Sequence, residues 1–546
     1  MMSAGSLFVV FAAGLLASAA GADTDRSYGA VIDAGSSGSR VYIYSWPKRE
    51  FEGDEFLPPQ NLSVPVAETT SFKCTPGVDS PAGVAELTRI VEEARKFLVS
   101  EASASEPART AIFLKATAGL RVLPPKQRSE QLQSVRQMLR ASGFLFRSES
   151  QARVISGEEE GVFGWITVNY MLGRLNYTLP GTLQGSYGAL DLGGASTQIT
   201  FKPSDPDILE NSYSVRLGGV ITESVYTHSF LYFGANEAIA RADAASVFAS
   251  WPGYPSLPAP ASVSSPCRFT GSTANYTDPA TGATTTISGS GSLASCRGDV
   301  VASLLNKAAL CLTVPKPSRA PALRAAASPG PRRAAALGAV PSPAPAINAS
   351  AAGCSFQGVY QPPAAGLRLV AFSGFTFAWA TLGMPEQGGT LEEFRSRADA
   401  FCALSWEDAQ RRYPAVPARF LAGYCFSAAY TLGLLVDGYG LDPRDPSALR
   451  VAPSADTYGW ALGSILYEAN SLPFSVLFPP TRKPQAAEPV PLYVVSALLA
   501  AAILIALALA ARLYRTSSAV RKPLIASRAD SVDSRDRGET INPISP

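Results

Sequence analysis

Val31-Ile-Asp-Ala-Gly-Ser-Ser-Gly-Ser-Arg-Val-Tyr-Ile-Tyr44 is the stretch of the sequence that decides the fold. Apolar residues on both sides of an Asp-x-Gly turn predict a strand, a tight turn and a second strand. The same pattern returns in Ala189-Leu-Asp-Leu-Gly-Gly-Ala-Ser-Thr-Gln-Ile-Thr-Phe201. Two similar hairpins at a domain-sized spacing predict two related lobes that face each other.

Both turns have the composition of an anion site. A turn rich in Gly, Ser and Thr after a strand presents backbone N–H groups and hydroxyls to a phosphate. Asp33 and Asp191 would repel that phosphate unless a cation intervenes, so we expect them to hold a hydrated divalent ion. An ordinary hairpin turn explains one such loop equally well, but two matching loops weaken that explanation. The predicted phosphate-binding residues are Gly35, Ser36, Ser37, Gly193, Gly194 and Ala195.

A third stretch, Ile155-Ser-Gly-Glu-Glu-Glu-Gly-Val-Phe-Gly-Trp-Ile166, predicts the start of a helix. Ser156 and Glu159 have the spacing of a capping box, and acidic residues suit a first helical turn. Glu160 at the same helix start is a candidate general base, although helix-start chemistry explains it about as well. Thr117 follows a short buried strand; it would line a phosphate site or belong to an ordinary strand-to-helix connection.

Length and composition narrow the class of protein. A chain of 546 residues predicts two domains or lobes, and alternating strand and helix patterns predict an α/β fold. The net charge of +2 gives no case for a nucleic-acid partner. The single histidine, His228, excludes a His-rich zinc site and makes a Ser-His-Asp hydrolase depend on one residue. Any metal must therefore use oxygen ligands, which suits Mg²⁺ or Ca²⁺.

The two ends of the chain carry membrane signals. Residues 1–22 predict a signal peptide or a signal anchor. Residues 490–511 are apolar and long enough to predict a transmembrane helix. Basic residues follow directly, so residues 512–546 are expected to be a cytosolic tail and the preceding region lumenal or extracellular. Four sequons fit that placement, at Asn61, Asn176, Asn275 and Asn348.

One segment interrupts the globular composition. Residues 315–346 are rich in Pro, Ala, Arg and Ser, and almost no large apolar residue is present to bury. A flexible, solvated insertion is the expected structure. A basic docking patch is the alternative interpretation.

Five stretches now carry a family resemblance: DAGSSGSR, KATAGLR, ISGEEEGVFGW, DLGGASTQ and YGWALGSIL, in that order. This is the order of the apyrase conserved regions, and the chain resembles the ecto-nucleoside triphosphate diphosphohydrolases of the actin/Hsp70-like superfamily. The resemblance covers about residues 28–475. It implies two actin-like (RNase H-like) lobes around a central nucleotide cleft, residues 27–165 with 437–480 and residues 166–436.

The resemblance also implies roles for residues. Glu160 would be the base that activates water, with Ser196 and Gln198 positioning that water and Thr117 contacting the terminal phosphate. Asp33 and Asp191 would orient the cation through its waters. The implied reaction is divalent-cation-dependent hydrolysis of the terminal phosphate of nucleoside tri- or diphosphates, with no covalent intermediate.

The resemblance implies two further sets of residues. Phe377 and Tyr424 would stack on the nucleobase, although Thr376-Phe377 replaces the tyrosine pair common in the family, which puts base preference in doubt. The implied disulfides are Cys267–Cys296, Cys402–Cys425 and Cys311–Cys354, with Cys74 unpaired.

Two other classes of function remain open at this point. One is another actin-like phosphotransfer enzyme, an exopolyphosphatase or a kinase. The other is a membrane glycoprotein that binds nucleotide without hydrolysing it. The residues do not distinguish tri- from diphosphates, one base from another, Golgi from cell surface, or one oligomeric state from another.

Overall fold

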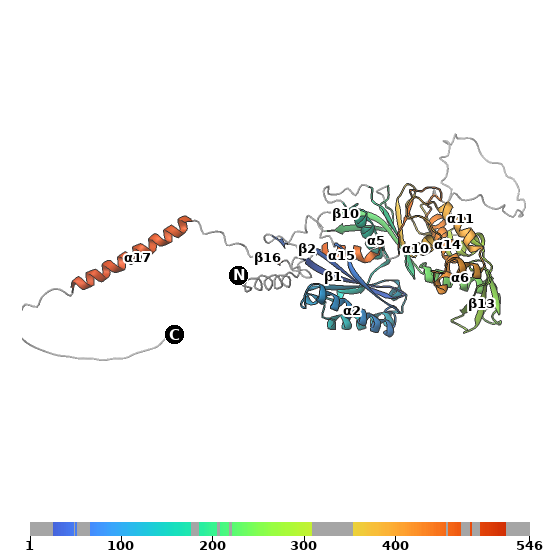
Figure 1. The fold of residues 1–546 in the computed structure, drawn as a ribbon, viewed down its shortest axis with the longest axis horizontal. Coiled ribbons are helices and arrows are strands. Elements are labelled where there is room, and N and C mark those ends of the chain that lie inside the picture. Colours follow the sequence, from blue (N-terminus) through green and yellow to red (C-terminus); the bar gives the residue numbers. More distant parts are fainter. Residues whose placement is uncertain are drawn as a thin grey trace, which may run out of the picture. The chain divides into compact units, whose positions relative to one another are not determined.

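The computed structural model describes residues 26–47, 50–51, 66–175, 185–204, 208–217, 221–307, 353–454, 457–470, 481–482 and 492–519. The chain divides into two units, Met1–Thr481 and Arg482–Pro546. The first unit contains two large sheets, each covered by helices (Figure 1).

The first sheet contains five strands in the order β4 (Val66–Cys74), β2 (Ser39–Pro47), β1 (Arg26–Ala34), β5 (Ala111–Ala116) and β6 (Ala152–Val154). The pairs β4–β2 and β2–β1 are antiparallel, whereas β5 and β6 run parallel to β1. Ala30 and Ile32 pack into one core and Val31 into another, so both faces of β1 are buried. Burial on both faces explains the unbroken apolar run before Asp33.

Two helices, α2 (Pro81–Glu101) and α4 (Pro125–Ala141), cover one face of this sheet. Helix α2 begins after Ser80, whose side chain accepts a hydrogen bond from the Gly83 N–H at 3.2 Å. Its buried residues recur at helical spacing from Leu87 to Leu98. The sheet and these two helices form what we call the first lobe.

The second sheet contains six strands in the order β15 (Leu449–Val451), β14 (Leu369–Ser373), β7 (Gly188–Leu192), β8 (Ser196–Phe201), β10 (Ile221–Leu231) and β9 (Ser212–Leu217). The strands β7, β8 and β10 form antiparallel pairs, and β14 and β15 run parallel to β7. Helix α6 (Ala235–Ala249) follows β10, just as α2 follows β4. The second sheet therefore repeats the order of the first, with β9 as an added edge strand.

Two helices connect the sheets. Helix α5 (Gly157–Met171) follows β6 of the first sheet but packs on β7, β8 and β10 of the second. Helix α15 (Trp460–Asn470) follows β15 of the second sheet and packs on β1 and α5. The two helices touch at Gly463, where a Cβ would lie 1.9 Å from the Phe163 carbonyl oxygen. This exchange of helices joins the two sheets through one shared apolar core.

We call the second sheet with its covering helices the second lobe. The remaining elements belong to this lobe or to the connections between elements. They are β3 (Glu50–Phe51), η1 (Pro107–Arg109), α3 (Ala118–Arg121), η2 (Glu149–Gln151), β11 (Ser262–Ser265), β12 (Thr273–Thr277), β13 (Thr284–Gly289), α7 (Leu293–Ser295), η3 (Cys296–Val301), α8 (Ala302–Leu305), η5 (Phe356–Gly358), α10 (Phe375–Thr381), α11 (Leu391–Cys402), α12 (Trp406–Arg412), α13 (Ala418–Leu421), α14 (Tyr424–Leu432), η6 (Gly433–Gly438) and β16 (Thr481–Arg482).

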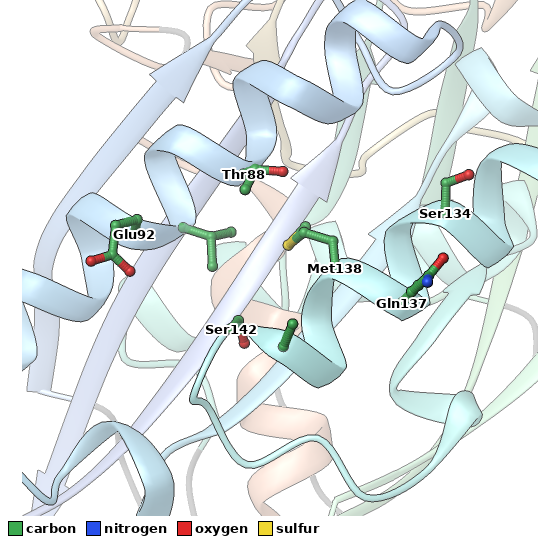
Figure 2. Close-up of a pocket in the computed structure, with 8 residues that line it drawn as sticks. Thr88, Glu92, Ser134, Gln137, Met138 and Ser142 are labelled. Carbon is green, nitrogen blue, oxygen red and sulfur yellow. The ribbon is translucent and has the colours of Figure 1, made fainter.

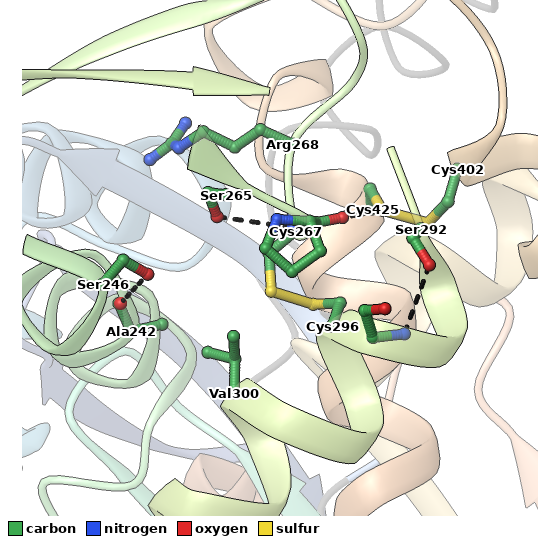
Figure 3. Close-up of a disulfide and its surroundings, with 12 residues drawn as sticks. Ala242, Ser246, Ser265, Cys267, Arg268, Ser292, Cys296, Val300, Cys402 and Cys425 are labelled. Atoms are coloured by element: carbon green, nitrogen blue, oxygen red, sulfur yellow. Dashed lines mark hydrogen bonds between the residues drawn. A yellow bond between two sulfur atoms is a disulfide. The ribbon is translucent and has the colours of Figure 1, made fainter. Parts of the chain in front are cut away.

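Disulfides staple the second lobe (Figure 3). The bridges Cys267–Cys296 and Cys402–Cys425 are present, with Cα–Cα separations of 4.8 and 5.1 Å. Both predicted pairings are confirmed, as is the free Cys74, which is buried. Cys354 is also disulfide-bonded. Its predicted partner, Cys311, lies outside the described residues.

The transmembrane prediction needs correction. Helix α17 (Leu492–Ala519) lies over the predicted span. In the part of the chain that the structure describes, however, no helix has both the length and the apolar character needed to cross a membrane. The predicted transmembrane helix at residues 490–511 is therefore wrong.

Several predictions fall on residues that the structure leaves undescribed: residues 1–22, 315–346 and 520–546, and the sequons at Asn61, Asn176 and Asn348. Asn275 is described and lies exposed on β12. The predicted lobe boundaries stay predictions; β15 pairs with β14 of the second sheet although it falls inside the segment 437–480 assigned to the first lobe.

Substituting Gly463 tests the contact between the two connecting helices. We expect Gly463→Ala to lower the free energy of unfolding by about 2–4 kcal/mol, because its Cβ would overlap a backbone carbonyl that cannot move aside. Urea unfolding followed by circular dichroism measures the change. Gly298→Ala is the control, since its Cβ meets nothing within 4 Å. Equal stabilities of the two variants would contradict the packing described.

Candidate active site

The two Asp-x-Gly turns have the same backbone geometry. The Gly35 N–H donates to the Gly38 carbonyl at 3.0 Å, and the Gly193 N–H donates to the Ser196 carbonyl at 3.0 Å. In each hairpin the aspartate lies on the strand that leads into the turn, two residues before the glycine whose N–H donates. The sequence repeat is therefore a repeat of structure.

The turns also face each other. A Cβ on Gly194 would lie 2.5 Å from Ser36 Oγ, and a Cβ on Gly119 would lie 2.7 Å from Ser36 Cα. Only glycine permits these approaches. The Thr117 N–H donates to the Ala34 carbonyl at 3.1 Å, which holds the start of α3 beside the first turn. Three predicted segments from two lobes thus meet at one place.

Each turn is packed against a glycine that precedes a helix, and the close approach leaves no space for a side chain there. A Cβ on Gly77 would lie 2.6 Å from the Gly35 carbonyl oxygen, and one on Gly234 would lie 2.3 Å from Ala195 N. The carbonyls of the second turn are also bonded by the start of α6. The bonds run from Ala235 N to Gly193 O at 2.8 Å, from Asn236 N to Gly194 O at 2.9 Å and from Tyr232 N to Ala195 O at 2.8 Å.

Those bonds fix the orientation of the second turn. Its carbonyls point towards the segment from Tyr232 to Asn236, which donates these bonds. Within the described residues, the N–H groups of Gly194 and Ala195 donate to no other backbone group. Oriented, unbonded N–H groups of this kind suit a phosphate oxygen.

Glu160 lies beside the turns, in the first turn of α5. Its side chain is 7% exposed. The Ser156–Glu159 capping box is present, which confirms the predicted helix start. Burial raises the pKa of Glu160 above its ordinary value, and the ion pair with Arg121 opposes that rise. A carboxylate whose pKa is raised by burial suits a general base near neutral pH.

Gln198 connects Glu160 with the second turn. Its Nε2 lies 2.8 Å from Ser196 Oγ, 2.9 Å from Ser229 Oγ and 3.3 Å from Glu160 Oε2. The two N–H groups of the amide satisfy the two shorter contacts. Its Oε1 is buried and accepts no hydrogen bond from the part of the chain described. That oxygen is an acceptor available to a water molecule next to Glu160.

Asp191 is the second buried carboxylate of the site. Burial raises its pKa to about 8, and the nearby charges of Glu160 and Asp33 add to the effect. Ser373 donates a hydrogen bond to it and partly opposes the rise. Its Oδ1 is buried and has no hydrogen-bond partner among the described residues.

The orphaned oxygen fits a divalent cation. Carboxylate oxygens are the ligands that Mg²⁺ and Ca²⁺ prefer. Over the described ranges, no group of three or more His, Cys, Asp or Glu side chains forms a direct metal cage. Mg²⁺ in phosphate-binding sites usually keeps several waters and takes one or two carboxylates, which is the kind of ligand that Asp191 offers.

Sequence reasoning did not assign three residues of this site: Arg121, Ser229 and Ser373. Arg121 is the last residue of the KATAGLR stretch, and that position was a signal for it. Ser373 has a φ of +54°, which places a strained residue against Asp191. Ser229 lies on β10, and nothing in its local sequence points to the site.

The predicted base-stacking residues lie on neighbouring helices of the second lobe. Phe377 on α10 is 51% exposed, and Tyr424 at the start of α14 is half-buried. Helices α10 and α14 pack together. Stacking on a nucleobase stays a prediction for both.

His228 lies apart from the proposed chemistry. It is on β10, with its ring 4.5 Å from that of Phe230, and burial lowers its pKa below the ordinary value. A neutral imidazole packed against an aromatic ring fits a structural role for His228 rather than a nucleophilic one.

Two grooves lie elsewhere. One, of about 480 Å³, lies between α2 and α4 and is lined by residues that include Thr88, Glu92 and Met138 (Figure 2). The other, of about 460 Å³, is lined by residues that include Arg297 and Asp437. Neither is lined by a predicted site residue.

Facing phosphate-type turns beside a dehydrated carboxylate define an enzyme of phosphoryl chemistry built on two α/β lobes. The crystal structure of nucleoside triphosphate hydrolases from Neospora caninum has this fold, with a TM-score of 0.55 and 15% sequence identity over 87% of this chain and 98% of that chain. The likeness shows the fold and confirms the predicted actin-like α/β lobes.

Sequence comparison identifies the family. The GDA1/CD39 (nucleoside phosphatase) family matches residues 20–317 and 345–485, and the chain belongs to this family. Ectonucleoside triphosphate diphosphohydrolase 2 of Mus musculus is 33% identical over 470 residues, covering 82% of this chain and 83% of the relative. Ectonucleoside triphosphate diphosphohydrolase 1 of Rattus norvegicus is 29% identical over 474 residues, covering 82% and 81%. The resemblance found on the five motifs is confirmed.

The raised pKa of Asp191 predicts that the stability of the folded protein depends on pH. Protonated Asp191 stabilises the fold below pH about 4, and this advantage is lost as the pH rises through about 8, where the folded protein must ionise it. In chelator at pH 8 we therefore expect Asp191→Asn to melt at least about 3 °C above the wild type. The difference should shrink as the pH falls towards 4.

Thermal melts with and without Mg²⁺ or Ca²⁺ measure both effects. The cation should raise the melting temperature of the wild type and leave Asp191→Asn unchanged. Asp399→Asn, at an exposed position, is the control and should behave as the wild type does. An Asp191→Asn variant that is less stable than the wild type in chelator at pH 8 would contradict the account.

Proposed function

We propose that this protein hydrolyses the terminal phosphate of nucleoside tri- and/or diphosphates, with Glu160 activating the attacking water and a divalent cation neutralising the phosphates. The observation that carries the proposal is the position of Glu160. A buried carboxylate with a raised pKa stands beside Gln198, whose free oxygen can orient a water, next to two facing phosphate-type turns.

Separate groups of residues would bind the phosphates and the cation. The N–H groups and hydroxyls of the two turns hold the phosphate chain from both sides, with Thr117 near the terminal phosphate. Asp33 and Asp191 would hold the cation mainly through water; when bound, Mg²⁺ or Ca²⁺ supplies positive charge against the phosphate oxygens.

The reaction needs no covalent intermediate on the protein. The water oxygen forms a bond to the terminal phosphorus while the bond from that phosphorus to the bridging oxygen breaks. The proton of the water passes to Glu160. The products are inorganic phosphate and a nucleotide that is one phosphate shorter.

Arg121 would keep Glu160 ready to accept that proton. Its guanidinium pairs with the Glu160 carboxylate, and its Nε donates to the Ile155 carbonyl at 3.0 Å. The positive charge opposes the effect of burial and favours the ionised carboxylate. The Arg121 charge therefore counteracts the effect of burial on the proposed base.

Family membership favours nucleotides over polyphosphate or a kinase reaction. The relatives carry the name ectonucleoside triphosphate diphosphohydrolase. That name, with the disulfides of the second lobe, supports a cell-surface or secretory-pathway location for this chain as well. Phe377 and Tyr424 are the residues that we propose for contact with the base.

Glu160→Gln tests the proposed base. General-base catalysis typically contributes 10²- to 10⁴-fold, so kcat should fall by about that factor while KM stays within about threefold. Phosphate release from a panel of nucleoside di- and triphosphates, with and without chelator, is the measurement. Chelator should abolish the wild-type activity.

Glu158→Gln is the matched control, because Glu158 is in the same helical turn but only half-buried. It should keep kcat within about threefold of the wild type. Full activity in Glu160→Gln would show that another group is the base. Nucleotide binding by the wild type without turnover in Mg²⁺ or Ca²⁺ would favour the non-hydrolysing alternative.

A further inference from the structure

A quartet of charges ties both connecting helices to the first sheet. Lys115 on β5 and Arg153 on β6 are direct neighbours in the parallel pairing of these strands. Lys115 pairs with Glu468 of α15, and Arg153 pairs with Glu159 of α5. Lys115 is fully buried and the other three side chains are at most 30% exposed. One basic residue on each of the two strands thus forms an ion pair with one of the two connecting helices.

Of the two ion pairs, Arg153–Glu159 constrains its helix more closely, because it makes two hydrogen bonds. Nη1 donates to Oε2 at 2.8 Å and Nη2 donates to Oε1 at 2.6 Å, which is a two-pronged contact. Although burial alone would raise the pKa of Glu159, the hydrogen bonds from Arg153 hold it below its ordinary value. The pair is therefore ionised at neutral pH.

Glu159 also makes hydrogen bonds within the first turn of α5. Its Oε2 also accepts from the Ser156 N–H at 3.1 Å, and its own N–H donates to Ser156 Oγ at 3.1 Å. One side chain thus fixes the first turn of α5 internally and anchors it to β6. The next residue in that turn is Glu160.

The opposite side of the same turn has no spare room. A Cβ on Gly157 would lie 2.0 Å from Ser229 Oγ, and one on Gly161 would lie 2.5 Å from Thr200 Oγ1. Both neighbours are on strands of the second sheet, β10 and β8. The turn is therefore fitted between the lobes, with glycines on one side and the Arg153 anchor on the other.

We propose that Arg153 is a positioning residue for the hydrolysis: through Glu159 it sets where the first turn of α5 rests between the lobes, and so where the Glu160 carboxylate meets the attacking water. This inference rests on the proposed function. Arg153 contacts Glu159 rather than the turns, so substrate binding should not depend on it. Small displacements of a reacting group can cost up to about 10²-fold in rate.

Three variants of the full-length protein test the pair: Glu159→Gln, Arg153→Met and the double variant. Glutamine at position 159 still completes a capping box, so Glu159→Gln removes the ion pair and leaves the helix start intact. Each single variant should lower kcat by about 10- to 100-fold, with KM within about threefold of the wild type. The double variant should be no slower than the slower single, because both changes remove one interaction.

Conservative rescue and a matched pair complete the design. Arg153→Lys should recover part of kcat, because lysine restores the charge but cannot make the two-pronged contact. Arg95 and Glu92 on α2 form a similar two-pronged pair, with both contacts at 2.7 Å. Arg95→Met and Glu92→Gln should leave kcat unchanged. Circular dichroism and melting temperatures confirm that each variant is folded.

The outcomes separate this inference from the proposed function. Unchanged kcat in Arg153→Met and Glu159→Gln, with Glu160→Gln inactive, would overturn the positioning role and leave the proposed function standing. Additive losses, or a raised KM at unchanged kcat, would overturn it too. Equal activity in Glu160→Gln and the wild type would overturn the proposed function and the positioning role together.

Discussion

The burial of carboxylates beside the two Asp-x-Gly turns is the constraint on which the rest of the structure depends. Asp191 and Glu160 are almost completely shielded from water, and such groups are costly as anions unless an opposite charge compensates them. Arg121 supplies that charge to Glu160. Asp191 keeps one buried oxygen without a partner in the described part of the chain. A cation between Asp191 and a phosphate would balance both negative charges, so in our proposal one arrangement would serve as cation site, phosphate site and base.

The repeat of one supersecondary order explains how such a site can arise. Apart from the added edge strand β9, each sheet has three antiparallel strands followed by two parallel strands, and each carries its Asp-x-Gly turn between its first two strands. The connecting helices α5 and α15 then pack on the sheet of the other lobe. This exchange brings the turns together and places the start of α5, with Glu160, beside them. The site therefore belongs to both lobes, and its geometry depends on how closely the helices fit between the sheets.

The sequence predicted those parts of the site that depend on interactions between residues close together in the chain. The turns around Gly35 and Gly193, the capping box at Ser156 and the two disulfides could be read from short stretches or from the family resemblance. Arg121 and Ser229 were missed, because their roles come from contacts with residues distant in the sequence, Glu160 and Gln198, that no local pattern encodes. The transmembrane helix was predicted from an apolar run alone, and the helix of the described residues did not meet the requirement. Phe377 and Tyr424 depend on a ligand, so neither sequence nor structure alone tests them.

The structure of the protein with Mg²⁺ and a non-hydrolysable nucleoside triphosphate analogue tests the central claim most directly. The account predicts one phosphate chain bonded by N–H groups of both turns, Gly35–Ser37 and Gly193–Ala195. It also predicts a hydrated cation between Asp33 and Asp191, and a water held by Gln198 and Glu160 in line with the terminal phosphorus. A phosphate chain bound by one turn only, or a terminal phosphorus with no water near Glu160, would contradict it.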